Sequence, residues 1–193
     1  MNRVQNLYRT SSCLDTLRQA KTQHEFVRIQ RNIKGCDEVV GYVVKLGATW
    51  VLVSVLGGGC ANGWVVLPVA DIEWVEAAPG GRFVRRGLEH RRSWPARSPR
   101  TQVNLSEGAD ALIVSAASYF PLLTLYAERE DPVHCYIGRP VSWTRERLVW
   151  QEMDLDAAWG EELCEWDLSD ITRVDFGGGY ETALARVAEL RGI

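Results

Sequence analysis

Residues 66–76 read VLPVADIEWVE, and residues 165–175 read EWDLSDITRVD. Each stretch sets an Asp-Ile pair among strand-forming residues, Asp71-Ile72 in the first and Asp170-Ile171 in the second, at an offset of 99 residues. Self-similarity at a fixed spacing is the sequence signature of a repeated structural unit. The two stretches therefore raise the question of whether the chain contains one unit twice.

Two more pairs of segments favour a duplication. WVLV at 50–53 matches RLVW at 147–150 at an offset of 97, and FVRI at 26–29 matches LLTL at 122–125 at an offset of 96. The matches keep one order along the chain, and the offset drifts by only three residues. Loop insertions between equivalent strands produce a drift of this size, so we expect an internal repeat.

Each copy is expected to consist of short β-strands joined by glycine-containing turns. Val, Trp and Leu dominate the apolar runs, as is typical of strands, and the glycines of LGGGCANG favour a hairpin loop. The expected strands cover 39–46, 49–56 and 63–69 in the first copy, and 122–128, 141–143, 147–153, 162–168 and 170–176 in the second. Short strands bury enough surface only by closing on themselves or by pairing with a neighbour. We therefore expect a mainly β protein with flanking helices, of the α+β class, built as two tandem small β-barrels.

The expected organisation has four parts. They are an N-terminal extension at 1–24, a first small β-barrel at 25–78, a linker rich in Arg and Pro followed by a helix at 79–120, and a second small β-barrel with a C-terminal helix at 121–193. The linking helix is expected to begin at Ser106 as its N-cap and to stop before Pro121. The C-terminal helix is expected over 181–190, with Leu184 and Val187 on its buried face.

A recognisable pattern of strands and turns is carried by four segments: GYVVKLGATWVLVSVLGGGCANGWVVLPVADIEWV, FPLLTLYAERED, CYIGRP and DITRVDFGGGYETALARVA. Over about residues 25–190 the chain resembles an uncharacterised bacterial family, frequent in actinobacteria, which is itself similar to tandem Sm-like small β-barrel proteins. The resemblance implies two Sm-like barrels and brings no activity with it. Sm proteins bind RNA through an Asp-x-x-x-Asn loop and a second, glycine-containing motif. LGATWVLV and LPVADIEWV lack that Asn and that Gly, so a shared fold does not imply the uridine pocket.

Charge is unevenly distributed along the chain. Residues 1–100 contain 15 Lys and Arg against 8 Asp and Glu, whereas residues 101–193 contain 7 against 17. Much of the positive charge lies in GRFVRRGLEHRRSWPARSPR, residues 81–100, where aromatic residues stand among arginines. Arginines hold phosphates and aromatic rings stack on bases, so this stretch predicts binding of nucleic acid, RNA in particular. The candidate nucleic-acid-binding residues are Arg82, Arg85, Arg86, Arg91, Arg92, Trp94 and Arg97.

The acidic counterpart is QEMDLDAAWGEELCEWD, residues 151–167, which contains no Lys or Arg. Its carboxylates do not keep the spacing of an EF-hand, because Ala158 and Trp159 interrupt the pattern, and we expect no metal site. Four interpretations of the charged stretches stay open. The basic stretch binds nucleic acid, the acidic half contacts a protein partner in a regulatory or scaffold role, the two stretches neutralise each other within the chain, or the basic stretch is a solvated linker without a binding role.

The glycine-rich stretch DFGGGYETA, residues 175–183, predicts a turn and not a phosphate-binding loop. It lacks the dinucleotide-binding and P-loop patterns, and Asp175 and Glu181 would repel a phosphate. G-x-S-x-G and H-E-x-x-H are also missing from the sequence, and His134 and Cys135, as strand neighbours, should point to opposite faces. We therefore expect no catalytic residues and no cofactor, and predict a non-enzymatic binding module.

Two bulk features predict the cellular context. No apolar run approaches the length that spans a bilayer, and the N-terminal residues show no apolar core of a secretory signal. The five cysteines lie far apart, without a C-x-x-C pair. These features predict a cytoplasmic protein with free thiols and without a membrane partner.

Overall fold

The computed structural model describes the backbone of residues 3–190 and the side chains of residues 12–189. The first half contains α1 (Arg3–Gln23), β1 (Phe26–Arg31), β2 (Val39–Leu46), β3 (Trp50–Gly57), β4 (Cys60–Pro68), the 3-10 turn η1 (Val69–Asp71), β5 (Ile72–Ala77) and α2 (Gly81–His90). The second half contains α3 (Ala109–Ala117), β6 (Leu123–Tyr126), β7 (Tyr136–Trp143), β8 (Arg147–Met153), β9 (Trp159–Asp167), β10 (Arg173–Phe176) and α4 (Gly179–Leu190).

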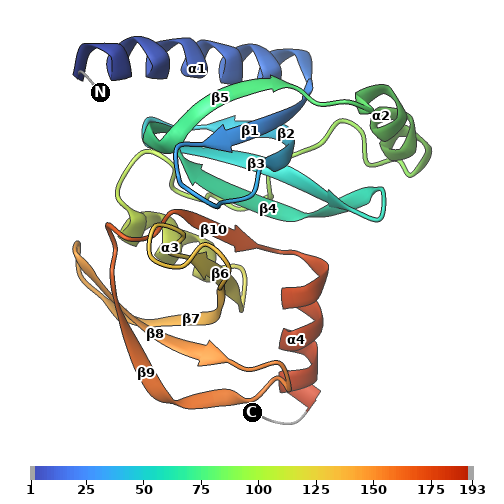
Figure 1. Cartoon of the computed structure of the whole chain (residues 1–193). Helices are drawn as coiled ribbons and strands as arrows, with labels where there is room; N and C mark the ends of the chain where they lie inside the picture. Colours follow the sequence, from blue (N-terminus) through green and yellow to red (C-terminus); the bar gives the residue numbers. More distant parts are fainter. Residues whose placement is uncertain (1–2, 191–193) are drawn as a thin grey trace.

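The strands form one ten-stranded sheet with the order β5-β1-β2-β3-β4-β10-β6-β7-β8-β9, in which every pair is antiparallel (Figure 1). Each half contributes five neighbouring strands, and both halves arrange them alike: the last strand of the half pairs with its first, and the second, third and fourth follow. The halves join where β4 pairs with β10.

The expectation of two closed Sm-like β-barrels is wrong, because the sheet is open. A half would close on itself if its fourth strand paired with its fifth. The free side of β4 is instead occupied by β10, with Val66 opposite Val174 and Trp64 opposite Phe176. β5 and β9 consequently remain as the two edges of the sheet. The class is nonetheless mainly β with flanking helices, as expected.

The ladder registers of the two halves correspond residue by residue at the spacings read from the sequence. Residues in the first strand of the second half come 96 positions after their counterparts in the first half. For the second and third strands this distance is 97, and for the facing parts of the fourth and fifth strands it is 99. Corresponding pairs are Val27–Ala77 and Leu123–Phe176, Gly41–Val55 and Gly138–Glu152, and Trp50–Pro68 and Arg147–Asp167. Asp71-Ile72 and Asp170-Ile171 thus stand at equivalent places in the two halves. The first pair lies at the start of β5, and the second lies just before β10.

Close backbone contact recurs at one glycine in each half. A Cβ on Gly41 would lie 2.4 Å from the carbonyl oxygen of Ser54, and a Cβ on Gly138 would lie 2.1 Å from that of Gln151. Both glycines precede a register shift between the second and third strands of their half. A bulge bends its strand, and the missing side chain lets the neighbouring backbone approach.

Three apolar clusters hold the sheet and helices together. The largest is shared by both halves and by α3, and includes Trp50, Leu52, Val66, Leu112, Ile113, Leu125, Trp150 and Val174. A second lies between α1 and the other face of the first half, and a third between α4 and the second half. Because the largest cluster draws on both halves, neither half buries its core alone.

The helices differ in part from the sequence expectation. In the N-terminal extension, α1 packs Cys13, Leu17 and Ala20, spaced for one helical face, on the first half. α3 begins at Ala109 with Gly108 as its N-cap and not at Ser106, because the side-chain oxygen of Asn104 accepts the Ser106 and Glu107 amides in a preceding turn. In α4 Leu184 is buried as expected.

Val187 was expected on the same buried face of α4, and this prediction is wrong. The Val187 side chain is 40% exposed, whereas Ala185 and Ala188 are buried beside Leu184. The helix is therefore rotated so that small residues, and not Val187, meet the sheet.

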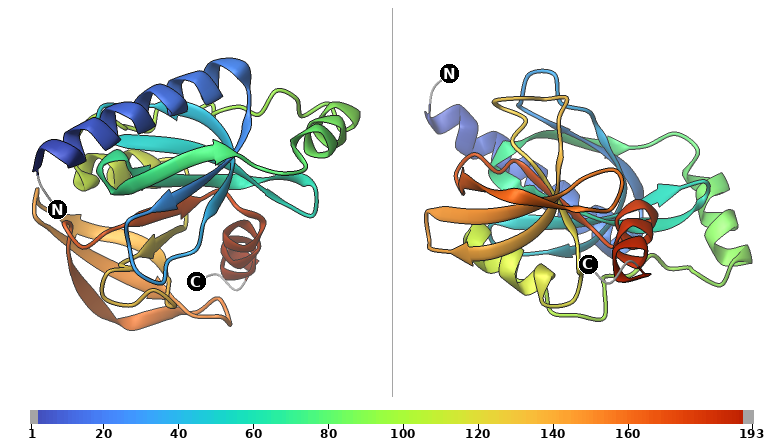
Figure 2. Two further views of the ribbon diagram at one scale, coloured as in Figure 1. Left: turned by 45° about the horizontal axis from the view of Figure 1, so that its top comes forward. Right: turned by 90° about the horizontal axis from the view of Figure 1, so that it is seen from below.

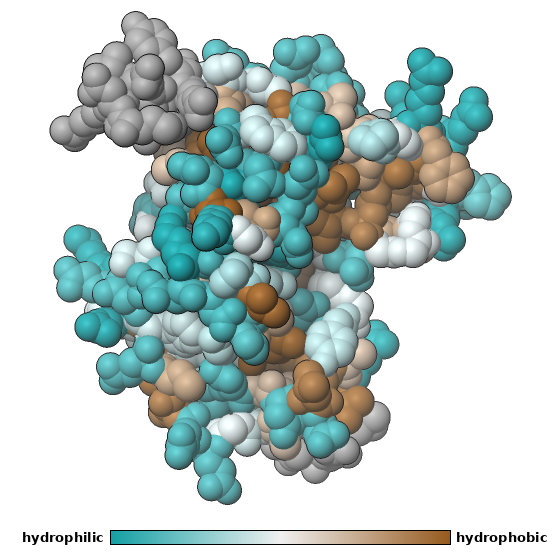
Figure 3. All heavy atoms as spheres, in the orientation of Figure 1, coloured by the Kyte–Doolittle hydropathy of each residue, from teal (hydrophilic) through white to brown (hydrophobic). Residues whose placement is uncertain are grey.

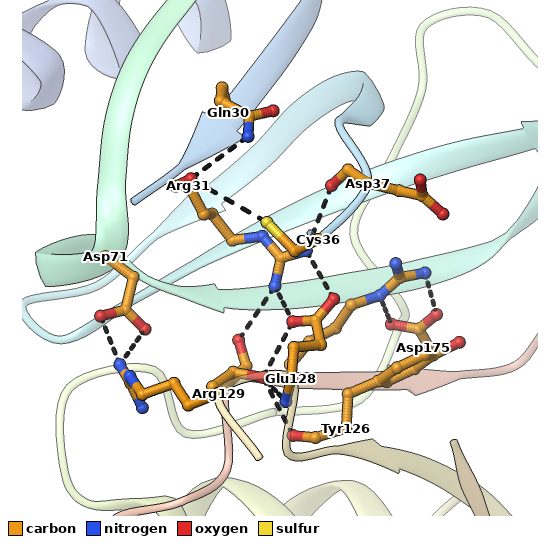
Figure 4. Close-up of polar contacts among 11 residues, drawn as sticks. Gln30, Arg31, Cys36, Asp37, Asp71, Tyr126, Glu128, Arg129 and Asp175 are labelled. Atoms are coloured by element: carbon orange, nitrogen blue, oxygen red, sulfur yellow. Dashed lines mark hydrogen bonds and ion pairs between the residues drawn. The ribbon is translucent and has the colours of Figure 1, made fainter. Parts of the chain in front are cut away.

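Two ion pairs connect the halves away from the β4–β10 ladder (Figure 4). The Arg31 guanidinium, fully buried, is bound by the Glu128 carboxylate on two nitrogens, one at 2.7 Å, and the Thr172 hydroxyl donates to the same carboxylate at 2.8 Å. Nearer the surface, Arg129 donates to both oxygens of Asp71 at 2.6 Å. The halves are thus fixed to each other by strand pairing, a shared core and buried charge.

Candidate nucleic-acid interface

The first part of the predicted linker is the helix α2, which follows β5 as α4 follows β10. Both helices lie at the same end of the molecule (Figures 1 and 2). The two helices therefore take equivalent places in the chain order of their halves. The arginines of the predicted site are held on a regular element and its continuation.

One face of α2 packs on the protein and the other carries arginine. Leu88 is 1% exposed and Val84, one turn earlier, is partly buried, whereas Arg82, Arg85 and Arg86 are exposed. Figure 3 shows hydrophilic side chains projecting from the outer side of this arm and apolar ones gathered at its base. The spacing of Val84 and Leu88 sets the arginines outward, because residues four apart lie on one side of a helix.

The aromatic side chain on this surface is Phe83, which is 80% exposed. It stands between Arg82 and the exposed Arg86. A phenyl ring in water beside two cations has the geometry of a stacking platform flanked by phosphate ligands. The sequence places Phe83 among the arginines but gives no sign that its ring is exposed.

Trp94, the aromatic residue among the predicted nucleic-acid-binding residues, is partly buried and already in contact with three side chains. Its ring meets Tyr42 edge-on at 5.4 Å and His24 at 5.7 Å, and the Arg85 guanidinium lies over it at 4.9 Å. Trp94 thus anchors the segment after α2 to the sheet. The sequence could not show this, because Tyr42 and His24 are distant along the chain.

α2 ends in a Schellman motif whose left-handed position is taken by Arg92. The Ser93 amide donates to the Leu88 carbonyl at 2.8 Å, the Arg92 amide donates to Glu89 at 3.1 Å, and Arg92 has a φ of 58°. Glycine is the usual residue there because it has no Cβ penalty. The exposed Arg91 and Arg92 side chains are consequently held at a fixed, strained turn.

The rest of the linker is fixed across the first half. The Trp64 indole donates to the Arg97 carbonyl at 2.9 Å, the Lys45 ammonium donates to Val103 at 3.0 Å, and the Trp50 indole donates to Glu107 at 2.9 Å. Arg97 itself is exposed. The structure therefore brings all seven predicted residues onto one ordered segment, six as exposed arginines and one as an anchor.

The arginines are not neutralised by the acidic half. Arg85 is paired with Glu89 at 2.8 Å, and the other five predicted arginines form no ion pair with any residue whose side chain is described. Glu161, Glu162 and Glu165 lie on β9, at the opposite edge of the sheet from β5, after which α2 follows (Figure 1). Pairing of the two stretches within the chain, one of the four interpretations, is thus not what the described side chains do.

A second polar cluster lies near the glycine-rich turn and lines a cavity of about 300 Å³. Arg173 donates to both oxygens of Asp175, and Thr124 donates to Glu181 at 2.8 Å. Burial raises the pKa of Asp175 even with Arg173 beside it, and desolvation likewise raises the pKa of the Cys135 thiol. The arginine of the cavity is already paired with a carboxylate and a second carboxylate lies beside it, so the cavity offers no unpaired cation to a phosphate. The raised pKa of the thiol disfavours a thiolate nucleophile.

Family models, curated proteins and solved structures all lack a match to this chain. Within the described residues, no three His, Cys, Asp or Glu side chains are grouped to hold a metal ion, and no helix is long and apolar enough to cross a membrane. The site must be judged on its own residues.

Proposed function

We propose that this protein is a non-enzymatic module that binds single-stranded nucleic acid, RNA in the first instance, along α2 and residues 91–97. One observation carries the proposal. Six exposed arginines, five of them without an ion pair among the described side chains, share one ordered segment with an exposed phenyl ring at Phe83. Unpaired guanidinium groups gain most from phosphate, because binding releases the counterions of the strand.

The comparison of α2 with α4 supports a role for the charge beyond folding. Both helices follow the fifth strand of a half, yet α4 carries Glu181, Glu189 and a single Arg186. A helix at this place therefore does not need a basic outer face to pack. The arginines of α2 are an addition to the five-stranded unit.

The test is a fluorescence anisotropy titration with labelled single-stranded RNA and DNA of roughly 10 nucleotides, within the site sizes of such modules. The logarithm of affinity should fall with the logarithm of salt concentration, by about 0.7 for each phosphate neutralised. The double variant Arg82→Ala/Arg86→Ala should weaken binding and flatten that slope.

The matched control is Arg145→Ala/Arg147→Ala, which removes the same charge from exposed positions on the second half. It should bind as the unmodified protein does. No binding at low salt, or equal losses in the two double variants, would contradict the proposal.

A second function, contact with a protein partner in a regulatory or scaffold role, is favoured by the edge strand β9. Its Glu161, Glu162 and Leu163 side chains are exposed, and its outer backbone groups have no neighbouring strand among the described residues. Open edges accept an added strand. Affinity purification with and without nuclease separates the two functions, since only protein contact survives nuclease. We place either function in the cytoplasm, in keeping with the five free cysteines.

A further inference from the structure

A cavity of about 300 Å³ lies between the segment after α2 and the β3–β4 hairpin. Its walls are apolar, formed by Leu56, Trp64, Leu88 and Pro95. Leu88 comes from the packed face of α2, so the cavity lies directly under the arginine-bearing helix. The volume is sufficient for a planar, nucleobase-sized group.

The cavity contains a polar group at Ser54. This side chain, on β3, lines the cavity and belongs to a residue that is 3% exposed. Its hydroxyl forms no hydrogen bond with any described residue, and it is not among the buried polar atoms that are shut off from water without a partner. Water in the cavity therefore satisfies it. A ligand atom that donates to or accepts from Ser54 would take the place of that water.

The remaining polar groups of the cavity favour an anion at its mouth. Arg92 and Arg97 line it, both are exposed, and neither is paired with a described carboxylate. No Asp or Glu side chain lines it. The neighbouring cavity, which shares Trp64, is lined by Asp175 and Glu181, and its arginine, Arg173, is already paired with Asp175. A ligand with an uncharged planar part and a negative part therefore fits the Ser54 cavity and not its neighbour.

We propose that this cavity receives one nucleobase of the bound strand, with the base against Leu56, Trp64 and Leu88, a base edge on the Ser54 hydroxyl, and the flanking phosphates on Arg92 and Arg97. This rests on the proposed function and deepens it, because it separates two parts of the interface. The outer arginines of α2 hold the backbone without regard to bases, and the cavity holds a base. Phosphate contacts position a strand, whereas base contacts discriminate among strands.

The test compares a single-stranded RNA with an abasic strand of equal length and charge. The base-bearing strand should bind about tenfold more tightly or better, the range measured for a base held against aromatic side chains. Ala61→Leu, at an exposed rim position that lines the cavity, should bring the two affinities together and leave the salt slope unchanged. Ala70→Leu, an exposed alanine that does not line the cavity, is the control and should change neither. Ser54→Ala should reduce the preference several-fold, and its melting curve reports whether it remains folded.

The outcomes distinguish failure of the cavity from failure of the proposed function. Equal binding of the two strands by the unmodified protein, with the salt slope intact, would overturn the cavity and leave the function standing. A preference for bases that Ala61→Leu does not change would also overturn it, since the base would then be held elsewhere, as on Phe83. No binding of either strand at low salt would overturn both.

Discussion

Arg92 combines a cost to folding with a candidate role in binding. Its φ of 58° places a long side chain in a conformation that glycine adopts freely. We expect Arg92→Gly to raise the free energy of unfolding, by up to about 1 kcal/mol, and at the same time to weaken nucleic-acid binding. Urea denaturation beside the anisotropy titration checks both effects. A destabilised variant would show that the Arg92 side chain supports the fold.

The two aromatic residues of the segment should respond in opposite ways. Phe83→Ala should leave the melting temperature unchanged, because the ring is 80% exposed, and should weaken binding by about 1–3 kcal/mol if a base stacks on it. Trp94→Ala should lower the melting temperature, because it removes the contacts with Tyr42 and His24. A stable Trp94 variant with lost binding would reverse these assignments.

Individual residues were the hardest features to predict from the sequence. The arginine cluster is recognisable from the sequence because arginine is charged wherever it is exposed, whatever the fold. Which aromatic residue is free depends on which face of α2 packs, and that is decided by Leu88 meeting the sheet. Ser54 stands in an apolar run that gives no sign of a cavity, since the cavity is formed by a segment some forty residues later in the chain.

At the level of elements, α4 offers a matched pair of substitutions. Leu184 is 6% exposed, in a cluster with Leu122 and Met153, whereas Val187 is 40% exposed. Leu184→Ala should lower the free energy of unfolding by about 2–5 kcal/mol, as for buried leucines elsewhere. Val187→Ala should cost much less, because less of its surface leaves water on folding. Thermal melts of both variants test the orientation of the helix, and equal losses would contradict it.

Strands were more predictable than the helix α2. β2 and β8 have the expected bounds, because runs of Val, Trp and Leu between turn residues specify a strand locally. α2 was missed because Gly81 and Gly87 lower its intrinsic helix propensity, although its arginines are good helix formers. Its position after β5, and the packing of Leu88, stabilise what the local sequence does not.

The whole molecule depends on which strand pairs with β4. β4 could pair with the fifth strand of its own half, β5, or with that of the other half, β10. The local sequence of each strand is the same in both cases, so the pattern of strands and turns does not distinguish a closed barrel from an open sheet. The choice is made by long-range contacts: the shared core, and the buried Arg31–Glu128 pair. No periodicity in the chain encodes these.

Breaking that pair tests the connection between the halves. Glu128→Ala leaves the fully buried Arg31 guanidinium without its carboxylate, and should lower the free energy of unfolding by about 3–5 kcal/mol. The double variant Arg31→Met/Glu128→Leu should recover most of that loss, because it leaves no buried charge. Asp71→Ala, which breaks the more exposed pair with Arg129, should cost about 1 kcal/mol or less. A double variant as unstable as Glu128→Ala would show that the pair supplies specific geometry and not only charge balance.

Because both halves have the same strand order, the two edge strands of the sheet correspond to the two strands that pair at its middle. β9 corresponds to β4, and β5 corresponds to β10, so the outer strands of two copies have the shapes that already join inside one chain. Pairing of β9 of one copy with β5 of the next would extend the sheet head to tail without limit. The β9 edge carries three carboxylates, Glu161, Glu162 and Glu165. Charged side chains on an open edge strand oppose its pairing with another chain. The acidity of β9 thus has a physical effect that needs no binding partner: it opposes the addition of a second copy at this edge.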